Sequence, residues 1–180
     1  MASHVALLRA VNLGPHNKVS MADLKSVAEA AGLAEARTLL QSGNLLFQIK
    51  KTGAALEKLL EGALSKQLEL KTPVIVRSAA EWHAAIEKNP FTVEARKDPG
   101  HLVLMPLKAV PAKGAVEALE AAIVGRERIQ LVGQNLYLVY PDGIGESKLT
   151  IALIEKKLGV TGTGRNWNTT SKIAALLNGT

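Results

Sequence analysis

Two pairs of short apolar segments, each pair joined by a turn that contains glycine, place the strongest constraint on how this chain can fold. The segments and their turns are 36–41 and 45–49 around Ser42-Gly43-Asn44, and 128–132 and 136–140 around Gly133-Gln134-Asn135. Gly and Asn tolerate the positive φ that tight hairpin turns require. Two β-hairpins, one in each half of the chain, therefore predict a repeated architecture.

The segments around these hairpins give each half nearly the same order of elements. Further strands are expected at 4–11, 73–77 and 101–106, with an extended segment at 160–167. Helices are expected from Ser20 to Gly32 and over 53–68, 78–86, 112–124, 147–158 and 168–177. Ser20 with Asp23, and Ser78 with Glu81, have the spacing of capping boxes. The order β-α-β-β-α-β predicts an α+β protein of two tandem ferredoxin-like lobes produced by duplication.

The predicted domains are an N-terminal lobe with a short extra helix at 1–88, a linker at 89–100, and a C-terminal lobe with a closing helix at 101–180. The linker is inferred from the polar stretch that contains Asn89-Pro90 and Asp98-Pro99-Gly100. A chain of 180 residues is long enough for one ordinary domain or for two small lobes.

Composition excludes several classes of protein. The chain is 47% hydrophobic and 21% charged, which is typical of globular proteins, and no apolar run approaches the ~20 residues that span a bilayer. The apolar N-terminus contains Arg9 and lacks a small-residue cleavage site, so we interpret it as a strand rather than a signal peptide. Without cysteine there is no disulfide, thiolate metal site or cysteine nucleophile, and a cytoplasmic protein is expected. No cofactor, metal, membrane partner or oligomeric state is predicted.

The net charge of +6 is concentrated at the two ends of the chain. Residues 1–50 hold 5 basic and 3 acidic side chains, and residues 151–180 hold 4 and 1, so these ends carry +5 of the total. Basic surfaces attract phosphates and nucleic acids, although a solvated basic face is the commoner meaning of such a charge. With 2 Trp, 2 Tyr and 2 Phe, a base-stacking platform of the RNA-recognition-motif kind is not expected.

The segment Thr163-Gly-Arg-Asn-Trp-Asn-Thr-Thr170 gathers a cation, an indole and several hydrogen-bonding side chains. Arg165 could hold a phosphate or carboxylate, Trp167 could cover a ring, and Asn166 could donate and accept. In the structural alternative, Asn168 caps the last helix, Trp167 fills the core and Arg165 pairs with a carboxylate. We favour the functional interpretation for Arg165 and the structural one for Asn168 and Thr169.

Other segments also carry candidate ligand-binding residues. In the Gly-rich segment 143–148, Ser147 and Lys148 are expected to open a helix whose amino end could bind an anion, or Ser147 could simply cap it. The loop 12–19 places Asn12, Asn17 and Lys18 after a central strand, where loops often carry function. The remaining candidates are Arg9, which needs a partner or a sheet end, and Asn44, which could contact a ligand or merely form the hairpin turn.

Five segments together resemble a known bacterial family. These are Ala6-Leu-Leu-Arg-Ala-Val-Asn-Leu-Gly14, His16-Asn-Lys-Val-Ser-Met-Ala-Asp-Leu24, Gln41-Ser-Gly-Asn44, Tyr140-Pro-Asp-Gly-Ile-Gly-Glu-Ser-Lys-Leu149 and Thr163-Gly-Arg-Asn-Trp-Asn-Thr169. In this order and spacing they closely resemble the family known as domain of unknown function 1697. Ala10 departs from the glycine usual there. The resemblance implies a cytosolic protein with two ferredoxin-like lobes, and it implies no activity.

Three functional hypotheses follow from these residues. In the first, Lys18, Lys148 and Arg165, with Asn12, Asn17, Asn166 and Trp167, form one site for an anion between the lobes. The ligand would be a nucleotide, a phosphorylated metabolite or a nucleic-acid backbone. In the second, the protein is an enzyme that acts on a phosphorylated substrate, with Glu146, Ser147 or His16 as base or nucleophile. In the third, it is a non-catalytic interaction module in which these motifs hold the lobes together. The four His show no metal-ligand spacing.

Overall fold

The structure is a computed structural model that describes residues 1–13, 15, 17–50 and 53–178. The chain divides into two compact units, and each is described by itself. Unit 1 consists of Met1–Ala84 together with Ile173–Thr180, and unit 2 consists of Ala85–Lys172. Unit 1 is therefore built from both ends of the sequence. The predicted boundaries at 88 and 100 stay predictions.

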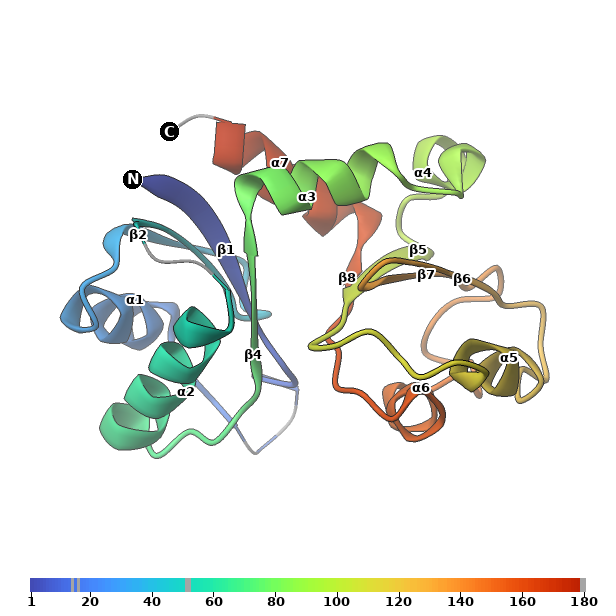
Figure 1. The fold of residues 1–180 in the computed structure, drawn as a ribbon, viewed down its shortest axis with the longest axis horizontal. Coiled ribbons are helices and arrows are strands. Elements are labelled where there is room, and N and C mark those ends of the chain that lie inside the picture. Colours follow the sequence, from blue (N-terminus) through green and yellow to red (C-terminus); the bar gives the residue numbers. More distant parts are fainter. Residues whose placement is uncertain (14, 16, 51–52, 179–180) are drawn as a thin grey trace. The chain divides into compact units, whose positions relative to one another are not determined.

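Unit 1 is built on a four-stranded antiparallel sheet with the strand order β2-β3-β1-β4. The strands are β1 (Ala2–Leu8), β2 (Ala34–Leu39), β3 (Asn44–Ile49) and β4 (Val74–Ser78). Two helices, α1 (Met21–Ala30) and α2 (Ala54–Leu68), lie together on one face of this sheet (Figure 1). Each helix buries one apolar stripe, as the helical spacing of its leucines and valines predicts.

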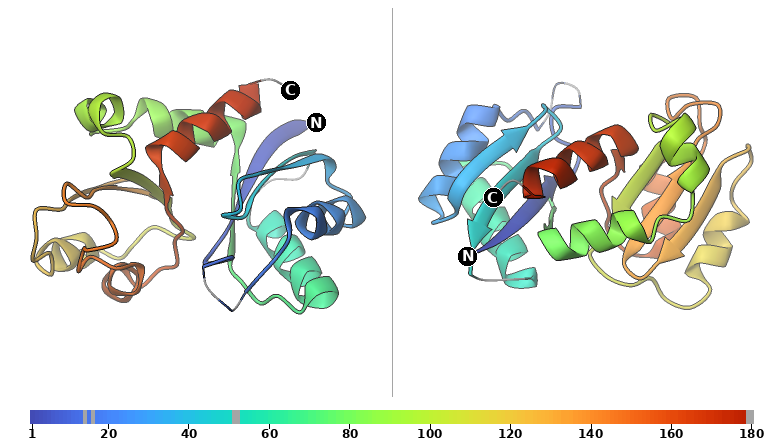
Figure 2. Two further views of the ribbon diagram at one scale, coloured as in Figure 1. Left: turned by 180° about the vertical axis from the view of Figure 1, so that it is seen from behind. Right: turned by 90° about the horizontal axis from the view of Figure 1, so that it is seen from above.

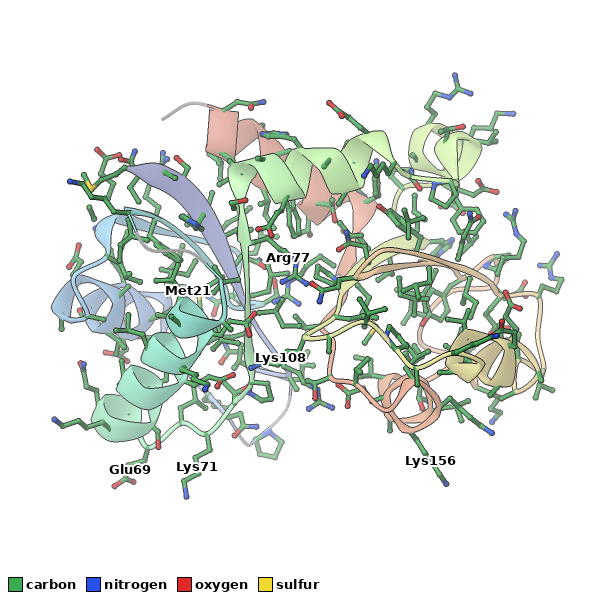
Figure 3. All side chains as sticks on the ribbon, in the orientation of Figure 1. Met21, Glu69, Lys71, Arg77, Lys108 and Lys156 are labelled. Carbon is green, nitrogen blue, oxygen red and sulfur yellow. The ribbon has the colours of Figure 1, made fainter. Side chains whose placement is uncertain are left out.

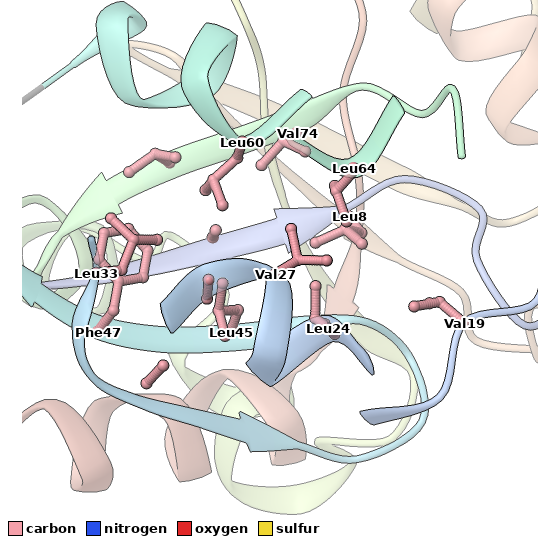
Figure 4. Close-up of a cluster of buried hydrophobic side chains, with 14 of the residues drawn as sticks. Leu8, Val19, Leu24, Val27, Leu33, Leu45, Phe47, Leu60, Leu64 and Val74 are labelled. Carbon is pink, nitrogen blue, oxygen red and sulfur yellow. The ribbon is translucent and has the colours of Figure 1, made fainter. Parts of the chain in front are cut away.

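The core of unit 1 lies between this sheet and the two helices. Alternate strand residues, among them Ala6, Leu8 and Leu45, meet Leu24 and Leu60 of the helices, and all five side chains are fully buried (Figure 4). The opposite face of the sheet is also apolar and buried, with these side chains: Val5, Leu7, Leu46, Ile75. The last turns of helix α7 (Trp167–Asn178) lie against this second face, because its two leucines and Leu46 line one small pocket.

Local chemistry places the ends of these elements where the sequence predicts them. Ser20 caps α1, since its hydroxyl accepts from the Asp23 amide at 3.0 Å and donates to the Asp23 carboxylate at 2.7 Å. The hairpin between β2 and β3 requires glycine at position 43. Gly43 has φ +74°, and a Cβ there would lie 2.6 Å from a Val11 methyl and 2.9 Å from the Leu8 Cβ.

Strand β4 lies at an edge of the sheet, and carboxylates occupy its outward amides. The Val74 amide donates to Glu61 at 2.8 Å, and the Val76 amide donates to Glu57 at 3.0 Å, both from α2. The Ser78 amide donates to Glu81 at 2.7 Å, in the capping box that opens helix α3 (Ala79–Glu87). Charged groups on an edge strand prevent another strand from pairing there.

Unit 2 is built on a second four-stranded antiparallel sheet, with the strand order β6-β7-β5-β8. Its strands are β5 (Leu102–Pro106), β6 (Arg128–Val132), β7 (Asn135–Val139) and β8 (Arg165–Asn166). The helices of this half are α4 (Thr92–Lys97), α5 (Ala115–Glu120) and α6 (Ile151–Leu158). The four strands lie side by side, with α5 and α6 on one face of the sheet (Figures 1 and 2). Apolar side chains of β5 and β7 pack against Leu119 and Ile154 of those helices.

Four predicted segments of unit 2 differ from the observed structure. Helix α5 was expected over 112–124 but begins at Ala115, because Gly114 has φ 84°, outside the helical region. Helix α6 was expected from Ser147 but begins at Ile151, because Thr150 caps it by accepting from the Leu153 amide. The predicted extended segment 160–167 is a strand only at Arg165–Asn166. The predicted linker 89–100 contains α4.

The structure confirms a mixed α+β protein with two similar four-stranded antiparallel sheets, each with its own helices. Within the described part of the chain, every helix is too short or too polar to cross a membrane.

Candidate functional site

In unit 1, the loop between β1 and α1 is held closed by the side chain of Asn12. Its amide nitrogen donates to the Val19 carbonyl at 3.0 Å and to the Gln41 carbonyl at 2.7 Å, and its oxygen accepts from the Val19 amide at 2.9 Å. Asn12 has φ 57°, a conformation that Asn adopts more readily than most residues. Ala10 has φ 51°, which explains why a glycine suits that position.

The other candidates of unit 1 fall into an exposed pair and a buried group. Asn17 and Lys18 are exposed on the loop, so their side chains are accessible to a ligand. Asn44 is fully buried, and its amide nitrogen donates to the Leu39 carbonyl at 2.8 Å and to the Ser42 hydroxyl at 3.0 Å. Arg9 lies just beyond the end of β1 and is half-buried. His16 lies outside the described residues.

In unit 2, Arg165 is an interior residue. Only 8% of its surface is exposed, and its guanidinium donates to the Thr163 hydroxyl and the Gly164 carbonyl, both at 2.9 Å. Burial lowers the pKa of Arg165 to about 10 because the charged form loses its hydration. The short strand β8 fixes this residue opposite Leu104 of β5. Arg165 is therefore part of the framework of its segment as well as a candidate for ligand binding.

The residues after Arg165 begin helix α7, and the cap differs from the predicted one. Asn166, not Asn168, caps the helix, because its side-chain oxygen accepts from the Thr169 amide at 3.0 Å. Asn168 is exposed, whereas Trp167 is 7% exposed, as the structural alternative predicted. The Thr170 hydroxyl donates back to the Asn166 carbonyl at 3.0 Å and further fixes the first turn.

The Gly-rich loop 143–148 precedes α6 rather than opening it. The Ser147 hydroxyl donates to Glu127 and accepts from the Leu149 amide at 3.0 Å, so local structure occupies it. Lys148 is exposed, and no carboxylate of the described residues lies within ion-pair distance of its amine. Ser147 therefore shapes the loop, and Lys148 is its accessible cation.

The two polar motifs of unit 2 meet at one end of its sheet, beside a pair that sequence reasoning missed. His101 Nδ1 lies 2.9 Å from the Asp98 carboxylate. The Tyr140 amide, which leads into the Gly-rich loop, donates to the His101 carbonyl at 2.9 Å. The Trp167 amide, at the start of α7, donates to the Pro99 carbonyl at 3.0 Å. We call this group the unit 2 loop cluster, and it consists of residues 98–101, 126–127, 140–148 and 166–168.

The Asp98–His101 pair gives the unit 2 loop cluster an oriented imidazole. An ionised carboxylate only accepts hydrogen bonds, so Nδ1 carries the hydrogen and Nε2 remains for another group. Gly143 adjoins this nitrogen, since a Cβ there would lie 3.9 Å from Nε2 in ordinary van der Waals contact, and its φ of +90° favours glycine. His101 and Asp98 are 43% and 53% exposed. The sequence signal for this pair was the three-residue spacing of Asp98 and His101 across Pro99-Gly100. It was missed because residues 89–100 were interpreted as a linker.

Charges in the unit 2 loop cluster are largely paired. Arg126 donates to both carboxylate oxygens of Asp142. This contact lowers the pKa of Asp142, mainly through the hydrogen bond. The Tyr140 hydroxyl donates to the Leu149 carbonyl at 3.2 Å, and burial raises its pKa to about 12. Across the described ranges, no three His, Asp or Glu side chains gather as metal ligands would.

The candidates Ser147, Lys148, Asn166 and Trp167 all lie in unit 2, as His101 does, and a common site formed by their side chains stays a prediction. Arg165 adjoins them through β8. The predicted convergence of Lys18 with Lys148 and Arg165 joins residues of two units and stays a prediction.

Comparison with known proteins identifies the family of this chain. A family model described as "Protein of unknown function (DUF1697)" matches residues 1–137, about three quarters of the sequence. The chain belongs to this family. The predicted resemblance is therefore confirmed. A search of curated protein sequences finds no match.

A solved structure has the same fold over nearly the whole length. It is described as "The structure of conserved bacterial protein SP0830 from Streptococcus pneumoniae". The similarity has a TM-score of 0.79 at 20% sequence identity and covers 99% of each chain. This likeness extends the shared fold beyond residue 137, through the segment that carries the second half of the unit 2 loop cluster.

Proposed function

We propose that this DUF1697 protein binds an anionic ligand at the unit 2 loop cluster. The observation that carries the proposal is the meeting of two separately predicted polar motifs at the Asp98–His101 pair. Loops at one end of a sheet are where folds commonly place binding residues. The ligand class is a nucleotide, a phosphorylated metabolite or a nucleic-acid backbone.

Each residue has a distinct role in this proposal. Lys148 supplies the exposed positive charge, and His101 Nε2 supplies a directional hydrogen bond. Asn166 fixes the first turn of α7, whose amino end favours negative charge. Trp167 and Arg165, both buried, hold that segment in place. Ser147 keeps the Gly-rich loop in its conformation through Glu127.

The unit 1 candidates also divide into residues proposed to bind and residues proposed to keep the local structure in shape. We propose that Asn17 and Lys18, both exposed, also bind an anion. Asn12 and Asn44 are proposed to keep their loop and hairpin in shape for that contact, because their amides are bound to main-chain atoms. Arg9, at the end of β1, is proposed to add positive charge there.

We further propose that the two units are duplicated ferredoxin-like lobes. The strand orders β2-β3-β1-β4 and β6-β7-β5-β8 are equivalent, and in both units a helix follows the first strand and another follows the hairpin. This arrangement supports the β-α-β-β-α-β pattern. The cysteine-free sequence supports the proposal of a cytoplasmic protein.

One observation favours a second candidate function. A carboxylate-oriented imidazole is a common general base, so the Asp98–His101 pair would suit an enzyme acting on a phosphorylated substrate. The earlier candidates fit this role less well, since the Ser147 hydroxyl is already hydrogen-bonded and Glu146 is an exposed residue of the loop.

Thermal unfolding in the presence of anions tests the proposal. The probes are inorganic phosphate, a nucleoside triphosphate, a sugar phosphate and a short single-stranded DNA, each at low and high salt. A ligand at 100 times its dissociation constant adds about 2.7 kcal/mol to the free energy of unfolding. For a chain of this length that raises Tm by about 5 to 10 °C. DNA binding should weaken steeply with salt, and small-ligand binding much less.

Three variants locate the effect. Lys148→Ala and His101→Ala should reduce the ligand-induced shift, while Lys156→Ala should retain it. Lys156 is a matched control because it lies on α6 of the same unit and points away from the protein (Figure 3). If no probe shifts Tm, or if all three variants respond like the parent, the binding proposal is wrong. The interaction-module hypothesis, which burial of Arg165 and Trp167 favours, would then lead.

A further inference from the structure

Strand β6 in unit 2 has an open and regular outer edge. It pairs with β7 in unbroken register from Arg128↔Val139 to Val132↔Asn135, across a two-residue turn. In such a hairpin the residues that flank the turn exchange both hydrogen bonds, and pairing then alternates along the strand. The main-chain groups of Ile129 and Leu131 are therefore directed outward. Together they offer two N–H donors and two carbonyl acceptors.

The other sheet edges in the described chain are closed to an incoming strand. The outward amides of β4 are occupied by carboxylates of Glu57, Glu61 and Glu81. Strand β2 is interrupted by a register shift between Ala34 and Arg37. Strand β8 has two residues. Proteins blunt edge strands by these means, so an unprotected edge is an exception that calls for a partner.

A groove runs between this edge and helix α5. It has a volume of about 430 Å³, and its lining includes Gln130 and Leu131 of β6 with Val116, Glu117 and Glu120 of α5. Lys113 also lines it. Two carboxylates against one amine make the groove acidic, although the whole chain carries +6. An edge strand beside a helix is the arrangement in which extended peptides add a strand and place alternate side chains in a groove.

We propose that the β6–α5 groove binds an extended basic peptide segment of a partner protein by strand addition. The partner's main chain pairs with Ile129 and Leu131. Every second side chain of the segment then points over α5, where apolar groups meet Val116 and lysine or arginine meets Glu117 and Glu120. This interaction site is separate from the unit 2 loop cluster and does not depend on it.

Charge argues against a second copy of this chain as the occupant. Antiparallel pairing of β6 with β6 of another copy would put both α5 helices on the same face of the joined sheet. The Glu117 and Glu120 rows would then face each other, and like charges at close range repel. A basic partner removes that repulsion and supplies the complementary charge.

Peptide probes test the proposal without altering the protein. A capped peptide of about seven residues, whose α5-facing alternate positions carry both lysine and valine, is titrated to about 1 mM into the ¹⁵N-labelled full chain and followed by NMR. The expected result is a shift of the amide signals of Ile129, Leu131 and α5. Two further probes carry N-methyl groups on one or the other set of alternate residues. One of them should lose binding by about 5- to 100-fold, since it blocks the hydrogen bonds to β6, and the other should bind normally.

Charge variants test the identity of the partner. The double variant Glu117→Lys with Glu120→Lys should weaken binding of the lysine peptide by about three- to tenfold, and Glu29→Lys on α1 of unit 1 should leave it unchanged. A peptide with glutamate in place of lysine should bind more weakly than the lysine peptide. The proposal is overturned if the amides of Ile129 and Leu131 do not respond, if both N-methylated peptides bind equally, or if charge reversal has no effect. A concentration-dependent dimer that buries β6 would instead identify a second copy as the occupant.

Discussion

Replacing Asn12 with alanine separates a structural role from a ligand-binding one. The side chain makes three hydrogen bonds to main-chain atoms, at 2.7, 2.9 and 3.0 Å. At about 0.5 to 1.5 kcal/mol each, they would contribute about 1.5 to 4.5 kcal/mol. Asn12 is half-buried, so we take the lower half of that range, about 1.5 to 3 kcal/mol. For a chain of this size, Asn12→Ala should lower Tm by about 3 to 12 °C.

Asn17→Ala is the matched control for this prediction. Asn17 also has a positive φ, 55°, against 57° at Asn12, so alanine is strained equally at both positions. Its side chain is exposed, and no side-chain hydrogen bond is formed within the described loop. The difference between the two variants in calorimetric or circular-dichroism melting therefore isolates the three hydrogen bonds of Asn12. Equal Tm values for the two variants would refute the reasoning, and Asn12 would again be a candidate ligand-binding residue.

Three further predictions concern other parts of the fold. Burial raises the pKa of Tyr137 to about 12, so the folded state keeps the phenol proton between pH 10 and 12, and stability falls as pH rises through that range. Tyr137→Phe should therefore lose less stability than the parent between pH 9 and 11.5, as measured by urea titrations. An equal loss in both proteins would contradict this. Ala10→Gly should raise Tm by roughly 1 to 3 °C by relieving a φ of 51°, whereas Ala22→Gly inside α1 should lower it, and a lower Tm for both would count against strain at Ala10. Replacing Glu57 and Glu61 with alanine should increase self-association in sedimentation velocity, while the glutamine pair, which keeps the acceptor oxygens, should sediment like the parent.

Elements whose signals are local were predicted well from the sequence. Ser20 and Ser78 cap their helices as expected, because each needs a partner three residues away, and the full capping box with its reciprocal main-chain bond forms at Ser78. Gly43 and the hairpins follow from backbone freedom at a single turn. Helix α6 was misplaced because Ser147 and Thr150 are both good caps, and the choice depends on Glu127, a residue 20 positions earlier that engages Ser147.

The candidate site was predicted less completely, for the same physical reason. The gathering of the motif residues at one site stays a prediction, and the roles of individual side chains depend on partners distant in sequence. Asn12 is a residue type that often contacts ligands, yet its side-chain amide donates to the main-chain carbonyl of Gln41, 29 residues away. Arg165 was favoured as a ligand contact because an arginine beside a tryptophan in a basic segment suits anions, and its burial comes from tertiary packing. The Asp98–His101 pair was concealed by a helix and turn inside a segment interpreted as a linker.

The composition of unit 1 from two distant segments has a consequence for biosynthesis. Residues Met1–Ala84 leave the ribosome long before Ile173, the first residue of the C-terminal segment that completes this unit. At about 5 to 20 residues per second, the 88 residues between Ala84 and Ile173 take roughly 4 to 18 seconds to translate. During that interval the face of the β1–β4 sheet that carries Leu46 lacks its α7 residues. The nascent chain therefore exposes an apolar surface that a chaperone could recognise until translation reaches α7.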